Sequence, residues 1–429
     1  MQNEKGSISV LVIGAGIAGI ESSLLLANSG AKVYLVEKAS YFGGNVIRWE
    51  EVFPNMECAT CMIAPKQQEL LQNDNIKLLT LSEVQSVEGS AGDFAVKVKR
   101  KARYVNLDNC IGCNECFGPC PVEVDNEFEQ GLSHRKAIHI PCAGALPNAP
   151  VIDTDNCLRF KGEDCQLCKE ACMFEAIDYT QQDAELELNV DAIVVATGFK
   201  TFDLNKAPQY GYKKLNNVYS VVEVERLCAS NGPTEGRSVL QNGEPPKSVA
   251  IVHCVGREDS GYCSSVCCMA SIKQAHFLKK KLPGLKISEL YSDLCVPGRV
   301  YQRFYQEVKE SGVDFVRATV NGVTQKGTGL AIKYTTEDGE AHALNVDMLI
   351  LAPAIEPAAD SDRLADVLAI ARDEHGFFSE GEPDVDSIDS SREGVFVAGC
   401  AQSPKDVPDT VAEAEATVGR ILSLSRQRS

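Results

Sequence analysis

Residues 8–38 read ISVLVIGAGIAGIESSLLLANSGAKVYLVEK, and this stretch decides the fold of the chain. The apolar run 8–13 has the length of a strand and leads directly into a GxGxxG turn formed by Gly14, Gly16 and Gly19. A helix-like segment follows, and then a second strand that ends at Glu37. Glycines permit close approach to a pyrophosphate, the helix N-terminus attracts its charge, and the acidic residue can bind a ribose. The sequence therefore predicts a dinucleotide-binding βαβ unit.

Two later apolar runs have the pattern of strands in the same sheet. DAIVVATGF (191–199) ends in Ala-Thr-Gly, and EGVFVAGCA (393–401) precedes a loop and a C-terminal helical segment. This arrangement resembles the two-dinucleotide-domain flavoprotein disulfide reductases, of which thioredoxin reductase is the simplest. The resemblance implies an α/β fold that binds FAD, with the last helix directing its positive end toward the reduced flavin. The FAD-binding residues that it implies are Gly14, Gly16, Ile17, Ala18, Gly19, Glu37, Lys38, Gly43, Gly44, Thr197, Gly198, Gly399, Cys400, Lys405 and Asp409.

The second dinucleotide domain departs from this pattern. KSVAIVHCVG (247–256) reads as the strand that should open an NAD(P)-binding turn, yet the turn is HCVGRED (253–259) and lacks GxGxxG. Other elements of the domain persist, including an expected helix at 301–311 and the closing strand VDMLILAPA (346–354). We infer that the scaffold has kept its strands and lost nicotinamide binding.

Twelve of the eighteen cysteines fall into three groups of four, spaced for iron–sulfur ligation. The first group is CxxCxxCxxxC followed by proline, and the second and third have longer first gaps. Because a cubane needs four thiolates, we expect three [4Fe–4S] clusters. The groups are Cys110, Cys113, Cys116 and Cys120; then Cys157, Cys165, Cys168 and Cys172; then Cys254, Cys263, Cys267 and Cys268.

In paired ferredoxin sequences the fourth cysteine of each run ligates the other cluster. One cubane should therefore take Cys172 with the first three cysteines of the first group, and its neighbour should take Cys120 with Cys157, Cys165 and Cys168. Zinc is the alternative for CxxC pairs, but an unbroken CxxCxxC run followed by Cys-Pro is rarely a zinc site. The seven-residue gap after Cys157, and Met173 in place of proline, depart from the pattern.

Composition excludes several classes of protein. A net charge of −18 disfavours nucleic acid as a partner, and 44% hydrophobic residues are ordinary for a globular protein of 429 residues. MQNEKGS carries no hydrophobic signal, and no apolar run has the length of a membrane span. Eighteen cysteines in a chain without an export signal indicate that the protein is in a reducing cytoplasm. We expect it to contact a membrane only through a partner.

Several motifs together resemble the A subunit of heterodisulfide reductase. They are GAGIAG (14–19), the pair Cys58 and Cys61 before Pro65-Lys66, the double ferredoxin insert, CVGRED…YCSSVCCMASIKQA (254–275) and GCAQSPKDVPDTV (399–411). In its shorter extent, compared with the family members from methanogens, the chain is similar to the A subunit of the quinone-interacting membrane-bound oxidoreductase. The resemblance implies that FAD exchanges electrons with the clusters, and that Lys273 lies near the flavin N5. It also implies other subunits as partners, among them one in the membrane, and a protein electron donor or acceptor.

The pair Cys58 and Cys61 has three open interpretations. It can act as a redox dithiol, since a CxxC thiolate is suited to exchange. In the family such a pair helps to ligate a cluster, which here would be completed by another subunit. Plain structural thiols are the third interpretation, and buried thiols are the expectation for the isolated residues Cys142, Cys228, Cys295 and Cys400.

The expected architecture is a thioredoxin-reductase-like α/β flavoprotein with an α+β ferredoxin insert. The FAD domain takes 1–105, 182–240 and 356–429, the insert takes 106–181, and 241–355 form the remnant of an NAD domain with the third cluster. The expected function is electron transfer between FAD and three clusters in a multi-subunit oxidoreductase, linked to a quinone-interacting membrane subunit or bifurcating electrons. The alternatives are a stand-alone NAD(P)H-dependent reductase and a flavin-free cluster scaffold.

Overall fold

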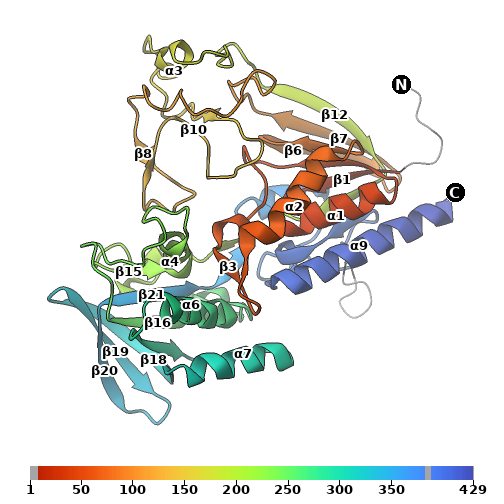
Figure 1. Ribbon diagram of the computed structural model, residues 1–429. Coiled ribbons are helices and arrows are strands. Elements are labelled where there is room, and N and C mark those ends of the chain that lie inside the picture. Colours follow the sequence, from red (N-terminus) through yellow and green to blue (C-terminus); the bar gives the residue numbers. More distant parts are fainter. Residues whose placement is uncertain (1–7, 382–387, 429) are drawn as a thin grey trace.

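The computed structural model describes residues 8–381 and 388–428. The N-terminal segment 1–7, on which the expected absence of an export signal partly rests, lies outside these residues. Figure 1 shows two sheet domains with a third, loop-rich unit at the top of the molecule. Within the described ranges, no helix combines the length and apolar character needed to cross a membrane.

The first domain is built on a parallel five-stranded sheet in the order β23-β13-β1-β2-β5. Parallel strands covered on both faces read as continuous apolar runs, which explains why the sequence showed them clearly. Helices α1 and α9 pack against each other beside this sheet (Figure 1). The elements are β1 (Ser9–Ile13), α1 (Ile17–Asn28), β2 (Lys32–Val36), β5 (Ile76–Leu79), β13 (Ala192–Val195), β23 (Val395–Val397) and α9 (Val407–Arg428).

A three-stranded antiparallel sheet, β6-β7-β12, contributes apolar residues to the core on the other face of the first sheet. The chain leaves it after Arg100 and returns at Ala184, so residues 101–183 form an insert, called here the cysteine-rich insert. The elements are β6 (Ser82–Ser90), β7 (Asp93–Arg100), β12 (Ala184–Val190), α2 (Ala59–Gln72), α8 (Ser361–Leu368) and the short pair β3 (Glu51–Val52) and β4 (Glu57–Cys58).

The second domain contains a seven-stranded sheet in the order β15-β21-β16-β17-β18-β19-β20, whose first five strands are parallel. Its strands are β15 (Val218–Ser220), β16 (Ser248–Val255), β17 (Lys286–Tyr291), β18 (Val313–Lys326), β19 (Gly329–Thr336), β20 (Ala341–Val346) and β21 (Met348–Pro353). Its helices are α4 (Val221–Cys228), α5 (Arg257–Ser260), α6 (Cys267–Lys281) and α7 (Gly298–Glu310). The helix expected at 301–311 is therefore α7.

One expected boundary changes. We expected 182–240 to belong to the FAD domain, but β15 pairs with β21 and α4 packs beside it, so both belong to the second domain. The change of domain occurs near β14 (Phe199–Thr201), which pairs antiparallel with β22 (Ile355–Pro357). At these two strands the described chain crosses from one domain to the other and back.

The cysteine-rich insert has little regular structure. It contains β8 (Val124–Asp125), β9 (His134–Arg135), β10 (Ile138–His139), β11 (Val151–Ile152) and α3 (Leu167–Glu170). The buried Arg103 attaches it to the first domain by donating to the carbonyl of Ser40. On the second domain, Arg226 of α4 makes two hydrogen bonds, of 2.8 and 2.9 Å, to the carboxylate of Glu129. The remaining short helical turns are Val46–Arg48, Leu204–Lys206, Pro208–Tyr210 and Gly399–Ala401.

Candidate functional site

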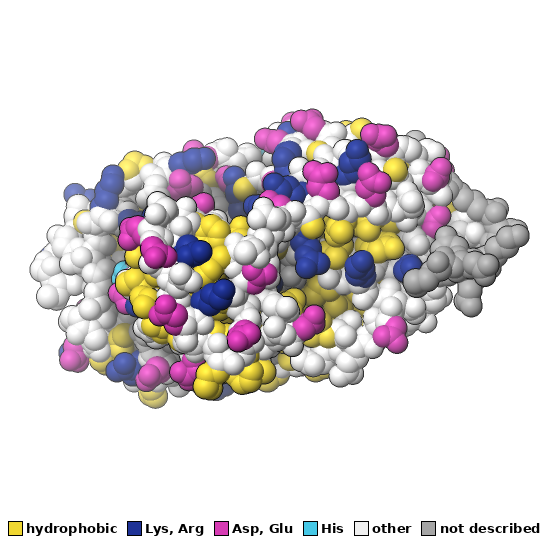
Figure 2. Space-filling model, turned by 90° about the horizontal axis from the view of Figure 1, so that it is seen from above, with side chains coloured by type: hydrophobic (Ala, Val, Ile, Leu, Met, Phe, Trp, Pro, Cys, Tyr) yellow, Lys and Arg dark blue, Asp and Glu magenta, His cyan; other side chains and the backbone are white. Residues whose placement is uncertain are grey.

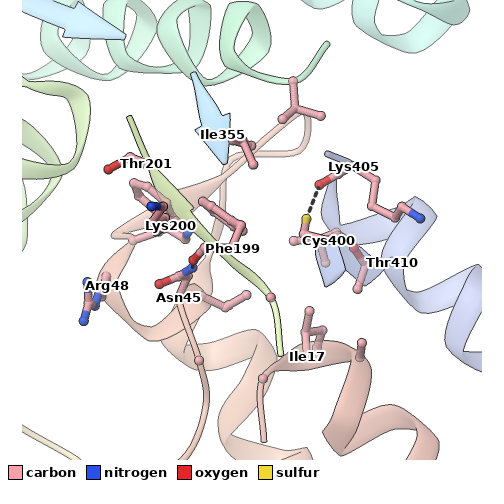
Figure 3. A pocket seen from close by; sticks show the side chains of 18 of the residues that line it. Ile17, Asn45, Arg48, Phe199, Lys200, Thr201, Ile355, Cys400, Lys405 and Thr410 are labelled. Carbon is pink, nitrogen blue, oxygen red and sulfur yellow. Dashed lines mark hydrogen bonds between the residues drawn. The ribbon is translucent and has the colours of Figure 1, made fainter. Parts of the chain in front are cut away.

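A cavity of about 440 Å³ begins at the carboxyl ends of the first sheet and reaches α6 of the second domain. Figure 3 shows its wall: Ile17 comes from α1, Phe199 and Thr201 from β14, and Cys400 and Thr410 from the C-terminal segment. Ligands of open α/β sheets bind in such a crevice outside the carboxyl ends of the strands. The cavity therefore lies where the βαβ motif predicted a dinucleotide.

Glycines at and beside the turn let backbone segments approach one another more closely than a side chain would allow. A Cβ on Gly14 would lie 2.4 Å from the carbonyl oxygen of Ala196, and a Cβ on Gly44 would lie 2.7 Å from Cα of Gly16. Likewise, a Cβ on Gly19 would lie 1.8 Å from the carbonyl oxygen of Gly14. Gly14 thus permits the close approach of the segment after β13, Gly44 permits its own segment to approach the turn, and Gly19 permits close packing of α1 on the turn.

Two polar groups on this floor fit a nucleotide ligand. The carboxylate of Glu37, at the end of β2, accepts hydrogen bonds from the backbone amides of Ala15 at 2.9 Å and Ala39 at 2.8 Å. Burial raises the pKa of Glu37, and these amides oppose that rise. The hydroxyl of Thr197 is buried, lines the cavity and has no hydrogen-bond partner among the described residues. A buried hydroxyl needs a partner, so Thr197 is suited to a ligand atom.

Most of the predicted FAD contacts line the cavity, and four do not. Those on the wall are Gly14, Gly16, Ile17, Ala18, Glu37, Lys38, Gly44, Thr197, Gly198, Cys400 and Lys405. Gly19, Gly43, Gly399 and Asp409 lie outside it. Asp409 is exposed on the first turn of α9, and Asp406 and Thr410 line the cavity there instead. Their helix begins at Val407, so its N-terminus still lies at the cavity.

The inner end of the cavity carries a buried ion pair. Lys273 of α6 is only 4% exposed, and its ammonium contacts the carboxylate of Glu225 and donates to the carbonyl of Glu51 at 3.1 Å. It also lies 5.4 Å from the ring centre of Trp49. Sequence reasoning singled out Lys273 but missed Glu225 and Trp49. The position of Trp49 shortly after Gly43-Gly44, as the one tryptophan of the chain, was the available signal.

The cysteine-rich insert brings its eight cysteines together in two sets. One small cavity is lined by Cys110, Cys113, Cys116 and Cys172, and a second by Cys120, Cys157, Cys165 and Cys168. These are the two sets that the crossed ligand pattern predicts, including Cys157 with its longer gap.

The thiols of the two sets influence one another. Burial, and then the neighbouring Cys168, raise the pKa of Cys116 to about 12. The hydroxyl of Tyr179 lies 3.1 Å from the sulfur of Cys168. Because ligand thiols must be deprotonated, metal binding here would release protons.

The third group lies between the second sheet and the cavity. Contact with Cys268, and then burial, raise the pKa of Cys267, and the exposed Cys263 adds to this rise. Contact with Cys267, together with the nearby His253 and its charge, lowers the pKa of Cys268 to about 4 against the effect of burial. Cys254, whose backbone is in the left-handed conformation with φ of 59°, also raises the pKa of Cys267. Cys267 itself lines the large cavity.

No three His, Cys, Asp or Glu side chains of the described residues are grouped to hold one metal ion. Iron–sulfur clusters bind their four thiolates through several irons, so their ligands surround a larger space than a single zinc ion needs. The two four-cysteine cavities of the insert have this form.

Cys58 and Cys61 lie apart from all these groups. Cys58 caps the N-terminus of α2 and accepts a hydrogen bond from the amide of Cys61 at 3.3 Å. Both are exposed, and neither lines the large cavity. A hydrogen bond to Cys58 raises the pKa of Cys61. The pair is accessible to another molecule but does not face the cavity.

Two comparisons describe the fold. A family model described as an NAD(P)-binding Rossmann-like domain matches residues 12–67. The structure is similar to thioredoxin reductase from T. acidophilum, with 14% identity, a TM-score of 0.54 and 99% of each chain covered. Thioredoxin reductase from Lactococcus lactis gives a TM-score of 0.53 at 12% identity, covering 98% of this chain and all of that one. The fold is therefore that of a two-dinucleotide-domain flavoprotein, as the sequence predicted.

Comparison with curated proteins gives much closer relatives. The chain is 38% identical over 434 residues to the A subunit of the ferredoxin/F(420)H(2)-dependent CoB-CoM heterodisulfide reductase of Methanosarcina acetivorans, covering 98% of this chain and 54% of that one. It is 37% identical to the iron-sulfur A subunit of the CoB–CoM heterodisulfide reductase of Methanocaldococcus jannaschii, covering 96% and 64%. The chain thus spans about half to two thirds of these relatives. Over nearly all of its own length, the chain is similar to the A subunits of heterodisulfide reductases.

Proposed function

We propose that this chain is the electron-transfer subunit of a heterodisulfide-reductase-like oxidoreductase, and that it binds FAD and three [4Fe–4S] clusters. One observation carries the proposal. Cys267 belongs to the third cysteine group and also lines the dinucleotide cavity. A cluster held there would share a wall with the flavin, so electrons could pass directly between them.

The residues of the cavity fit FAD. Gly14, Gly16 and Gly44 line the cavity beside the turn, where a pyrophosphate would bind. Glu37 lines it at the end of β2, where a ribose would bind, and the unpartnered hydroxyl of Thr197 lines it too. When bound, FAD would supply the conversion between two-electron and one-electron transfer, because cubanes carry single electrons. Lys273 and the N-terminus of α9 would place positive charge beside it and favour its reduced, anionic form.

The insert provides a route to a protein partner. Large apolar side chains next to its cysteines are exposed, namely Leu107, Ile111, Leu167, Met173 and Phe174. Figure 2, viewed from above, shows hydrophobic side chains interrupting the charged surface on this side. Exposed apolar patches often mark interaction sites. We propose that a protein electron donor or acceptor docks beside the two insert clusters.

Finer features of the proposal rest on the family alone. Other subunits of the complex would carry the substrate chemistry, and one of them would be a quinone-interacting membrane protein. This chain would bind to that subunit from the cytoplasm. Electron bifurcation is a further proposal: the relative from Methanothermobacter thermautotrophicus is named for both a heterodisulfide and a ferredoxin. Exposed Cys58 and Cys61 are proposed as partial ligands of a cluster shared with a partner.

A stand-alone NAD(P)H reductase is the weaker candidate. Cys254 lies at the end of β16, and α5 then places the acidic Glu258 and Asp259 where a pyrophosphate would bind. Negative charge there opposes a phosphate ligand.

Cofactor analysis of the anaerobically purified chain tests the proposal. We expect one FAD and about twelve iron atoms, because one dinucleotide cavity and three four-cysteine groups are present. A Cys254→Ser, Cys263→Ser variant should retain FAD and lose about a third of the iron, whereas Cys228→Ser, at an isolated buried thiol, should change neither. If the chain holds only eight iron atoms and its Cys254 and Cys268 react with an alkylating reagent, the proposal of a third cluster is wrong. A protein without flavin absorbance would be the cluster scaffold instead.

A further inference from the structure

A buried His–Glu pair lies beneath the third cysteine group and has no part in the function proposed so far. His253 and Glu289 stand on adjacent parallel strands, β16 and β17, and both side chains are completely buried. Ile251 pairs with Glu289, and His253 lies two residues further on, so the two side chains share one face of the sheet. Nε2 of His253 lies 2.6 Å from a carboxylate oxygen of Glu289.

The other ring nitrogen of His253 is left without a partner. Nδ1 of His253 is buried and makes no hydrogen bond among the described residues. Cys268 begins α6, which packs over this face of the sheet, and it lies close enough to the imidazole to raise the pKa of His253 against the effect of burial. Since Nε2 is engaged by Glu289, Nδ1 is the nitrogen that remains for the sulfur.

Charge decides which nitrogen carries hydrogen. The free energy of a buried pair is lowest when its two members together carry no net charge, because an unpaired buried charge costs several kcal/mol. Either the imidazolium donates to the carboxylate through Nε2, or a protonated Glu289 donates to Nε2 of a neutral ring. Nδ1 carries hydrogen in both arrangements, and can therefore donate to Cys268.

Packing alone does not call for this pair. Its neighbours include Ile251 and Ile287 on the same face of the sheet and Ile272 on the covering helix α6, all at most 2% exposed. Replacing a buried ion pair by apolar residues is often neutral or stabilising. A histidine and a glutamate in such a core, directed at a cysteine, indicate a role toward that cysteine.

We propose that His253 donates a hydrogen bond to the sulfur of Cys268, that Glu289 fixes the ring in this orientation, and that the pair raises the reduction potential of the third cluster. The inference rests on the proposed function, because it requires a cluster at this group. Hydrogen bonds to ligand sulfurs withdraw electron density and stabilise the added electron. The third cluster would thereby become a better electron acceptor for the flavin beside Cys267. His253 and Glu289 are positioning residues in this scheme.

Redox titration of the full-length chain, followed by electron paramagnetic resonance, tests the pair. His253→Phe keeps a ring and removes the donor, so the third cluster should lose at least tenfold in electron affinity, which is 59 mV for one electron. Glu289→Gln should shift the same cluster in the same direction by less. Tyr179→Phe is the matched control: it removes the hydroxyl 3.1 Å from Cys168, so it should shift an insert cluster and leave the third unchanged.

A measurement on the unmutated chain adds a direct readout. With ¹⁵N-labelled histidine, the reduced third cluster should show a histidine nitrogen coupling that His253→Phe removes. A third cluster that forms in both variants at its original potential would overturn the inference. If His253→Phe cannot assemble the cluster, an unchanged potential in Glu289→Gln overturns it equally. A wild-type chain that binds only two clusters would instead refute the proposed function, and the inference with it.

Discussion

Replacing Lys273 by Met tests the structure of the inner cavity wall most directly. Methionine keeps most of the apolar stem and removes the ammonium that contacts Glu225 and the carbonyl of Glu51. Both members of the Lys273–Glu225 pair are at most 5% exposed, so the variant leaves a carboxylate buried without a cation. Loss of one partner of a buried pair costs about 3–5 kcal/mol, and we expect that decrease in the free energy of unfolding.

The same substitution should lower the reduction potential of bound flavin. A hydrogen bond from a charged group is worth about 1.5–3 kcal/mol, which for two electrons corresponds to about 30–60 mV. Glu225→Gln is the matched variant: it removes the competing carboxylate and leaves Lys273 to act on the flavin, so the potential should rise.

Denaturant unfolding and spectroelectrochemistry of the flavin-loaded chain measure the two effects. The double variant Lys273→Met, Glu225→Leu should recover most of the lost stability, because no unpaired charge remains. A Lys273→Met protein that unfolds at the wild-type denaturant concentration and keeps the wild-type flavin potential would refute the reasoning. It would mean that Lys273 neither pairs with Glu225 nor acts on the flavin.

Three other predictions follow from individual contacts. Gly14→Ala should abolish FAD retention, since the added Cβ lies 2.4 Å from a backbone oxygen, whereas Gly419→Ala on α9, with open space around it, should retain FAD as measured by absorbance. Stopped-flow mixing of the isolated chain with NADH or NADPH should not bleach the flavin; rapid bleaching would mean that the turn 253–259 does bind a nicotinamide nucleotide. Glu129→Gln should cost about 3–5 kcal/mol and expose the insert to protease, because Glu129 and Arg226 are buried partners; Glu127→Gln, at a carboxylate that is 69% exposed, should cost at most about 1 kcal/mol.

The parts of this molecule that could be predicted from sequence have local causes. The strands β1, β13 and β16 are continuous apolar runs, and the turn after β1 needs its glycines for steric reasons that hold in any such turn. Cysteine spacing carries information of the same kind, since loop length limits which thiols can surround one cluster.

The missed features depend on residues that meet only in the folded chain. Glu225 and Lys273 are 48 positions apart, and Arg226 and Glu129 are 97 apart, so no spacing rule connects them. The three-residue strand β15 is too short to show any periodicity, which is why its sheet was assigned wrongly. Asp409 was predicted because it marks the N-terminus of the last helix, but Asp406, just before the helix, and Thr410 line the cavity instead.

The bond between Arg226 and Glu129 has a mechanical consequence. The insert is covalently part of the first domain, through β7 and β12, yet Glu129 is bonded to α4 of the second. Within the described residues, the chain joins the two domains through the short strands β14 and β22, which by themselves would form a hinge. With the insert bonded across, the three units close a ring, and swinging one domain about that hinge would first have to break a buried ion pair. A rigid ring of this kind would keep the distances between the bound redox centres constant. Electron transfer between them would then not be limited in rate by a domain motion.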